Sequence, residues 1–330
     1  MNKKVLYIGS FPPPYGGVTI KNDLICNFLR KDYEVVSCKK KGIFSLFFFF
    51  IKSYFCSKFI FGIGSNKKLF RIIKLYSFLH LFKIKQSIVV VMGGSFSDEL
   101  LKNPRMARRF KRVKALLVET SQMKERLIEN KFKNVFVFPN CRLSPLHRLN
   151  PSKNNRLKCL YYSKICIEKG ADLALDLASI HQDVSFDFWG EIESAFKEEF
   201  TKAIEKRNNC KYCGVFSKHD DDLYLFLNKY DLLIFPSLWK HEGVSGALIE
   251  AKIAGLPSIV TNWKYNPEIV NDHIDGLVVK TNDLAGFSES LSMIKDDQFL
   301  LAELKKNSLA NGKAYYIESY KRLFEELIGD

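Results

Sequence analysis

Short apolar runs alternate with longer stretches of mixed apolar and polar residues along the first half of the chain. The first run, Lys4–Gly9, is followed by a proline- and glycine-rich loop at Ser10–Gly17 and by helical spacing over Val18–Arg30. Four further runs are interpreted as strands: Glu34–Ser37, Ser87–Met92, Val113–Val118 and Val135–Phe138. Apolar runs that alternate with helices indicate parallel strands covered on both faces.

The second half repeats this alternation after a polar segment, Leu149–Asn155, which we interpret as a linker. Six more strands are expected, at Lys158–Tyr162, Val184–Trp189, Lys211–Cys213, Leu232–Phe235, Ser258–Thr261 and Leu277–Val279. An amphipathic helix is expected at Tyr316–Ile328. The pattern therefore predicts an α/β fold with two doubly wound, Rossmann-like domains that face each other across a cleft. We place an N-terminal domain at 1–150, a C-terminal domain at 151–315, and a helix that crosses back at 316–330.

Charge is divided unevenly between the halves. Residues 1–150 hold 29 Lys and Arg against 8 Asp and Glu, whereas residues 151–330 hold 22 against 28. A strongly basic half indicates an anionic partner, and the candidates are nucleic acid, an anionic membrane or a phosphate-bearing substrate.

The stretch Lys39–Lys85 concentrates this charge. It holds eleven Lys and Arg and thirteen Phe and Tyr, and no acidic residue occurs from Val35 to Ser97. Its uncharged run, Gly42–Ile51, is shorter than the roughly 20 residues that a spanning helix needs. We predict that Lys39–Lys85 lies on an anionic membrane surface. A buried helix with snorkelling lysines and a nucleic-acid surface remain open, although no nucleic-acid-binding motif is found.

The eight cysteines are scattered, and we interpret them as free thiols in a reducing cytoplasm. Cys210 and Cys213 form a C-x-x-C without a second pair, so no zinc site is predicted. The run Asp220–Asp222 is interpreted as a solvated helix start rather than a metal site. Met1–Lys4 leads directly into the first strand, and we expect no secretory signal.

Candidate chemistry gathers between Asp231 and Pro267. Ser245 is expected to cap a buried helix that carries Glu250, and Glu242 lies in the preceding loop. A carboxylate in a buried helix must have partners, and Gly246, one turn earlier, leaves that face open to a ligand. Helix N–H groups suit a phosphate, and carboxylates suit sugar hydroxyls. The alternative is that Glu250 pairs with Lys252 or Lys264.

The spacing Glu242-x7-Glu250, within HEGVSGALIEAKIAGLP, resembles the signature of retaining glycosyltransferases of family 4, which have the GT-B fold. Ser163–Gly170 is similar to the family pattern G-R-x(3)-E-K-G, with Ser163-Lys164 in place of Gly-Arg. The family's histidine after a strand of the first domain has no counterpart in Val91–Ser95. Residues 139–330 carry most of the resemblance. Further matches are Gly16-Gly17, Pro139-Asn140, Gly190-Glu191 and Gly214.

The resemblance implies a role for each matching position. Glu242 would contact the transferred sugar, Glu250 the ribose hydroxyls, and Lys164 and Lys169 the diphosphate. Backbone amides would hold the sugar and the distal phosphate at Gly243, Val244, Ser245, Gly246 and Ala247. Glycines of the first domain, Gly16 and Gly17, would let its loop approach the phosphates. The base would lie at Gly214, Val215 and Phe216. The acceptor side would be formed by Gly94 and Ser95 in place of the histidine.

These expectations describe a retaining, metal-independent hexosyltransferase without a cofactor. The two lysines and the helix N-terminus would stabilise the departing diphosphate, as a divalent metal does elsewhere. The donor would be a UDP-sugar, and the acceptor a lipid-linked saccharide of O-antigen or capsule synthesis. The protein would be cytoplasmic and peripheral on the inner face of the cell membrane, with no nucleic-acid partner. Two alternatives are a nucleotide-sugar epimerase of GT-B fold and a non-catalytic membrane- or nucleic-acid-binding scaffold. A dehydrogenase is disfavoured, since no G-x-G-x-x-G follows the first strand.

Overall fold

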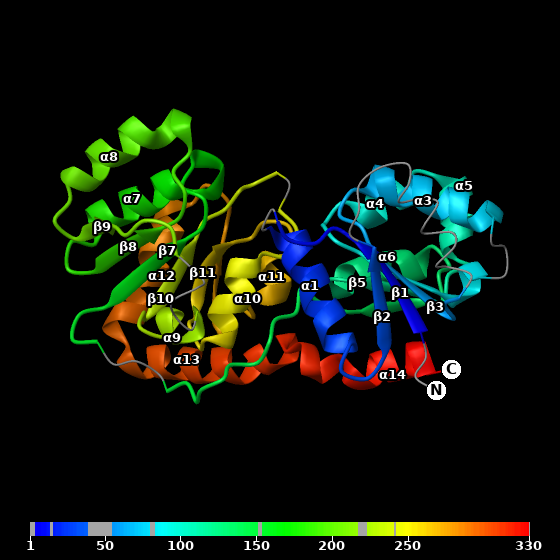
Figure 1. The fold of residues 1–330 in the computed structure, drawn as a ribbon. Coiled ribbons are helices and arrows are strands. Elements are labelled where there is room, and N and C mark those ends of the chain that lie inside the picture. The colour runs from blue at the N-terminus through cyan, green and yellow to red at the C-terminus, as the bar shows by residue number, and fades with distance from the viewer. Residues whose placement is uncertain are drawn as a thin grey trace. The chain divides into compact units, whose positions relative to one another are not determined.

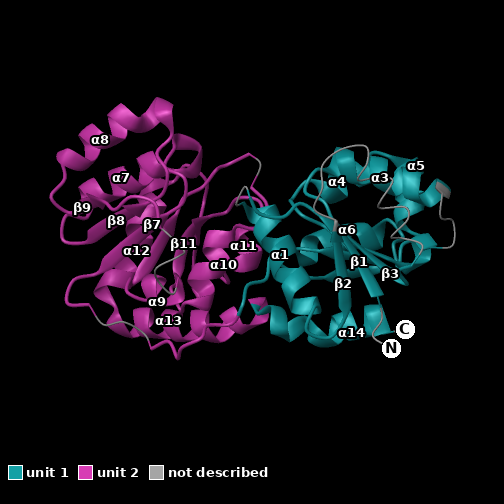
Figure 2. Ribbon diagram, in the orientation of Figure 1, with its two compact units in different colours: residues 1–143, 316–330 teal, residues 144–315 magenta. Residues whose placement is uncertain are grey.

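The chain folds into two compact units, which are coloured separately in Figure 2. The computed structural model describes residues 4–13, 16–38, 55–79, 83–150, 154–216, 223–240 and 242–329. Unit 1 comprises Met1–Leu143 and Tyr316–Asp330, and unit 2 comprises Ser144–Tyr315. The units therefore divide at Leu143, slightly before the boundary that the sequence suggests at residue 150. Asp220 to Asp222 lie outside the described residues.

Unit 1 is built on a sheet of six parallel strands in the order β2-β1-β3-β4-β5-β6 (Figure 1). The strands are β1 (Lys4–Gly9), β2 (Glu34–Cys38), β3 (Lys58–Gly62), β4 (Ser87–Val90), β5 (Ala115–Val118) and β6 (Val135–Val137). Strands β3, β4 and β5 are buried along their whole length, as expected for parallel strands covered by helices on both faces.

The membrane interpretation of Lys39–Lys85 is wrong for the part that forms β3. Phe59 and Phe61 are fully buried and pack on Tyr76, with ring centroids 5.3 and 5.5 Å apart. A central parallel strand and an interfacial segment are both rich in bulky apolar residues, so composition does not separate them. Residues 39–54 and 80–82 of the segment, including the run from 43 to 51, lie outside the described residues.

The helices of unit 1 cover both faces of this sheet. They are α1 (Gly17–Leu29), α3 (Asn66–Leu79), η1 (Lys83–Gln86), α4 (Phe96–Leu101), α5 (Pro104–Phe110), α6 (Ser121–Glu129), η5 (Ile317–Tyr320) and α14 (Lys321–Gly329). The C-terminal segment belongs to this unit because Phe324 packs against Phe28 and Phe138, with ring centroids 6.2 and 5.3 Å apart. Its first turn is a 3-10 turn rather than part of one continuous helix.

Unit 2 repeats the design with six parallel strands in the order β12-β11-β10-β7-β8-β9. The strands are β7 (Lys158–Tyr162), β8 (Ser185–Trp189), β9 (Cys210–Tyr212), β10 (Leu232–Phe235), β11 (Ser258–Thr261) and β12 (Gly276–Val279). Each agrees with an expected run to within a residue or so. The predicted class, two doubly wound α/β sheets, is therefore confirmed.

The helical elements of unit 2 follow its strands in alternation. They are η2 (Ile167–Lys169), α7 (Ala171–Ile180), η3 (Ser194–Phe196), α8 (Lys197–Glu205), α9 (Leu223–Leu227), α10 (Gly246–Ile253), α11 (Asn266–Ile269), α12 (Leu284–Asp296), α13 (Gln298–Gly312) and η4 (Lys313–Tyr315). Asp231 anchors α13 to the sheet, because it lies 2.6 Å from the Lys305 ammonium and accepts a hydrogen bond from the Lys158 backbone. Within the described ranges, no helix has the length and apolar character to cross a bilayer.

Candidate active site

The loop after β7 carries both lysines that the sequence singles out. The Tyr161 hydroxyl, on the buried end of β7, lies 2.9 Å from the Lys164 carbonyl oxygen and 3.2 Å from that of Lys169. One buried side chain thus fixes the backbone at both lysines. Burial raises the pKa of Tyr161 well above its ordinary value, so this hydroxyl stays a donor.

A glycine brings this loop against the end of β10. Gly170 has φ +74°, and a Cβ there would lie 2.5 Å from the Pro236 carbonyl oxygen. The close approach therefore requires glycine. The Leu238 N–H donates to the Glu168 carbonyl oxygen at 2.9 Å, which joins the two loops directly.

Lys169 and Glu242 meet in this contact. The Lys169 ammonium lies 2.6 Å from Glu242 Oε2, and the two side chains are 15% and 8% exposed. Ser237 Oγ donates to the same carboxylate oxygen at 2.7 Å. The Lys169 ammonium also lies 5.6 Å from the centre of the Trp239 ring. Two residues that are far apart in the sequence therefore share one largely buried polar site at the carboxyl ends of β7 and β10.

The helix α10 follows directly from this loop. Its N-cap is Ser245, as expected, with an extended backbone and no hydrogen bond from the Ser245 side chain to the helix. Glu250 is 5% exposed on the buried helix. The alternative partner Lys252 instead pairs with Asp275, with its ammonium 2.8 Å from Oδ2. Burial lowers the pKa of Lys252, against the effect of this carboxylate.

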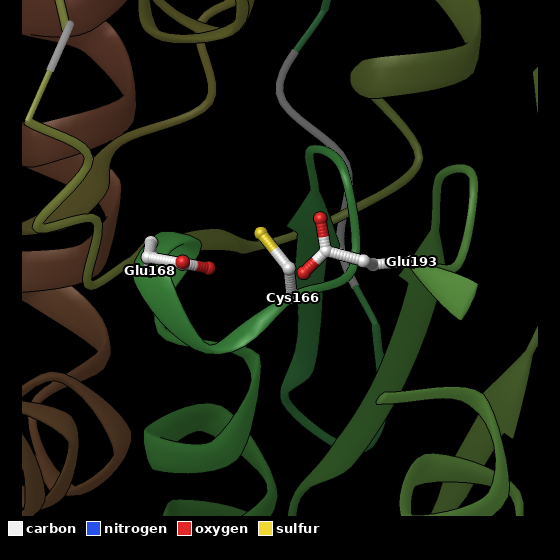
Figure 3. A group of neighbouring side chains, drawn as sticks. All are labelled: Cys166, Glu168 and Glu193. Carbon is white, nitrogen blue, oxygen red and sulfur yellow. The ribbon is translucent and has the colours of Figure 1, made fainter. Parts of the chain in front are cut away.

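Lys164 is paired with Glu193, which the sequence does not single out. The hydrogen bond from the Lys164 ammonium to Glu193 raises the pKa of Lys164. Figure 3 shows Glu193 beside Cys166 and Glu168, and ligand atoms of these three residues lie within 4.8 Å of one another. Burial raises the pKa of the Cys166 thiol, and the Lys164 ammonium already neutralises one carboxylate. These three side chains are therefore poor ligands for a divalent cation.

The predicted base-binding segment follows β9. Gly214 has φ +87° and its carbonyl oxygen accepts a hydrogen bond from the Gly190 N–H at 2.9 Å. Val215 is 64% exposed. Phe216 stacks on Phe226 of α9, with ring centroids 4.4 Å apart and planes 28° apart.

In unit 1 the predicted residues also lie at the carboxyl end of the sheet. Gly16 is the N-cap of α1 and Gly17 its first residue, and among the described residues a Cβ at either would meet no atom within 4 Å. Gly94 lies in the turn between β4 and α4. Exposed Ser95 donates to Glu99 at 2.7 Å and accepts from Asn66 at 3.1 Å.

A buried ion pair next to this turn was not expected. Lys21 of α1 lies 2.6 Å from Oε1 of Glu119, which directly follows β5, and the side chains are 2% and 6% exposed. The Gly93 N–H donates to the other oxygen of Glu119 at 3.3 Å. The pair ties α1, β5 and the turn after β4 to one another. Nothing in the sequence marks it, because the partners are distant and each lies among ordinary helix or loop residues.

Solved structures share this architecture over nearly the whole chain. A structure of Anabaena HepE in complex with UDP matches with a TM-score of 0.75 at 14% identity, covering 99% of both chains. The apo form of the lipopolysaccharide outer core galactosyltransferase WaaB matches with a TM-score of 0.71 at 13% identity, covering 98% of this chain and 99% of the other. These similarities define a GT-B fold.

The family follows from the sequence of unit 2. The model of the family "Glycosyl transferases group 1" matches residues 146–311, about half of the chain, and the protein belongs to that family. A galactosyltransferase of Escherichia coli, named for UDP-Gal and α-D-GlcNAc-diphosphoundecaprenol, is 34% identical over 94 residues, 28% of this chain and 24% of the relative. An N-acetylgalactosaminyltransferase of Campylobacter jejuni, named for a diphospho-undecaprenol substrate, is 27% identical over 32% of this chain and 29% of the relative. The chain thus matches under a third of the length of these relatives.

Proposed function

We propose that the protein is a retaining glycosyltransferase of family 4 that transfers a sugar from a UDP-sugar to a lipid-linked saccharide. Its product would serve O-antigen or capsule synthesis, and it would act as a peripheral protein on the inner face of the cell membrane. The observation that carries the proposal is the largely buried contact between Lys169 and Glu242, in the loop before α10. The names of the matched relatives support a nucleotide-sugar donor and a polyprenyl-diphosphate acceptor.

The chemistry of the site fits this reaction. Breaking the bond between sugar and phosphate leaves negative charge on the diphosphate. Lys164 and Lys169, together with backbone N–H groups at Gly243–Ala247, would stabilise that charge. Because these groups are cationic or partly positive, the step needs no metal or cofactor in this proposal.

The carboxylates would select the donor. Glu242 would accept hydrogen bonds from the sugar hydroxyls, and Glu250 from the ribose hydroxyls. Gly214–Phe216 would lie along the base, and Gly16 and Gly17 would let the loop before α1 approach the phosphates.

The test is turnover of UDP-galactose with membrane lipid extract by the wild type and by Glu242→Gln. We expect the variant to lose at least about a hundredfold in turnover, since a charged hydrogen bond to the reacting sugar disappears. Glu198→Gln is the matched control, because Glu198 pairs with Lys202 at the same 2.6 Å but its side chain is 83% exposed. Equal loss in both variants, or full activity of Glu242→Gln, would contradict the proposal. Release of an epimerised UDP-sugar without lipid would instead indicate an epimerase.

A further inference from the structure

Helix α3 presents cations and apolar side chains on one exposed stripe. The exposed residues occur at the spacing i, i+1, i+4, i+7, i+8 and i+11, which places them on one face of a helix. They are Lys67, Lys68, Arg71, Lys74, Leu75 and Phe78. Leu75 is 40% exposed and Phe78 is 79% exposed. The opposite face is buried in unit 1 through Leu69, Ile73 and Tyr76.

Helix α5 extends this surface. Figure 1 shows α3 and α5 beside each other, and their contact includes the Phe70 and Phe110 rings, 5.6 Å apart. Arg109 Nε also donates to Ser77 Oγ of α3 at 3.2 Å. Further arginines, exposed at one-turn spacing along and just after α5, are Arg105, Arg108 and Arg112. We call these exposed residues of the two helices the α3–α5 surface.

Acidic residues do not interrupt the α3–α5 surface. The sequence has no Asp or Glu from Val35 to Ser97 or from Leu100 to Val118. Within the ranges that the structure describes, no carboxylate forms an ion pair with any arginine or lysine of this surface. Its charge is therefore available to an external anion, and the whole α5 contribution lies outside the segment Lys39–Lys85 that the sequence indicated.

We propose that the α3–α5 surface binds the anionic leaflet of a lipid bilayer. Lysines and arginines attract anionic headgroups, each by about fivefold in binding, and exposed apolar side chains between them enter the boundary of the acyl chains. Leu75 fits this partner better than nucleic acid, whose bases could stack on Phe78 but would gain little from an aliphatic side chain. This inference rests on the proposed function, because a transferase with a lipid-linked acceptor would meet that acceptor at a membrane surface.

The experiment is co-sedimentation of the full chain with vesicles of phosphatidylcholine alone or with phosphatidylglycerol, without donor or acceptor. One variant replaces four lysines and arginines of α3 by Gln: Lys67, Lys68, Arg71 and Lys74. The matched control replaces four exposed lysines of unit 2: Lys197, Lys202, Lys206 and Lys211. A third variant replaces Leu75 and Phe78 by Ser. Circular dichroism of each variant checks that it is folded.

We expect binding that requires phosphatidylglycerol, that falls at least about tenfold in the α3 variant, and that falls severalfold in the serine variant. The unit 2 control should stay within about twofold of the wild type. Equal losses in the α3 variant and the control would overturn the inference. Tighter binding to a single-stranded oligonucleotide than to vesicles would replace the lipid partner by nucleic acid. Because no glycosyl transfer is measured, either outcome leaves the transferase assignment standing.

Discussion

The buried pair of Lys21 and Glu119 gives the sharpest prediction about stability. Glu119→Ala should destabilise unit 1 by about 3 kcal/mol, at the lower end of the range for breaking a buried ion pair. The side chains are 2% and 6% exposed, so the Lys21 ammonium would be left in a dry site. The Phe138 ring, whose centre lies 5.4 Å from that ammonium, still stabilises the charge in the variant and so reduces the loss of stability. The lost acceptor for the Gly93 N–H adds to it.

A double variant that removes both charges distinguishes the effect of an unpaired buried charge from the effect of losing the ion pair. Lys21→Met combined with Glu119→Leu leaves no buried charge, and we expect this double variant to be more stable than Glu119→Ala alone. The loss in free energy of unfolding of this double variant should be smaller than the summed losses of Lys21→Met and Glu119→Leu by more than about 1 kcal/mol. The Glu34→Ala variant is the matched control, because Glu34 pairs with Lys4 at the same 2.6 Å on the surface of the same unit.

The unfolding of each unit has to be measured separately. All three tryptophans lie in unit 2, at 189, 239 and 263, so their fluorescence in urea reports that unit. Hydrogen exchange of peptides from β4 and β5 reports unit 1. We expect faster exchange in Glu119→Ala with unchanged tryptophan transitions. If Glu119→Ala exchanged no faster than Glu34→Ala, or if the losses of the single variants simply added, the account of a coupled buried pair would be wrong.

Two further predictions concern unit 2. Glu193→Gln should strengthen UDP binding by about twofold in calorimetry, because it releases the Lys164 ammonium from a partly exposed ion pair. The control Glu191→Gln, at an exposed residue two positions away, should change the affinity for UDP less. For His181, 2.8 Å from Ser288, burial lowers the pKa, so the unfolded chain binds the proton more readily. The stability of unit 2 should therefore fall as the pH drops below about 6.5, and His181→Gln should flatten this dependence of the urea midpoint in tryptophan fluorescence. Equal effects of Glu193→Gln and Glu191→Gln on UDP binding would refute the first prediction. A wild-type urea midpoint that is insensitive to acid would refute the second.

The sequence predicts most strands because the fold buries both of their faces. The run 232–235 is wholly apolar, the run 258–261 has two aliphatic residues between Ser258 and Thr261, and each is a fully buried strand. The same rule fails at β3, where Lys58 begins the strand and basic residues surround it. Lys58 is only 3% exposed in unit 1, and only tertiary packing distinguishes it from a lysine at a membrane surface.

The site could be predicted only in part, for a related reason. The acidic pair and the two lysines stand in recognisable local patterns, whereas their partners are set by contacts between distant segments. Ser237 holds Glu242, and Tyr161 holds the loop that carries the two lysines. The sequence around Ser237 and Tyr161 does not distinguish them from polar residues without such a role. Local patterns thus indicate which groups carry chemistry, and the fold decides what neutralises them.

The two lysines differ in how firmly they are held, and this difference has a consequence for catalysis. Lys169 and Glu242 are 15% and 8% exposed, whereas Lys164 and Glu193 are 41% and 34% exposed. A pair in water costs little to separate, but a largely buried pair resists separation because each charge would lose its partner in a poorly solvated place. A diphosphate would therefore recruit Lys164 by exchange with Glu193 and would meet Lys169 as a fixed charge. Since transition-state stabilisation depends on charges that need not reorganise, Lys169 would be the better placed of the two to act on the leaving group in the proposed reaction.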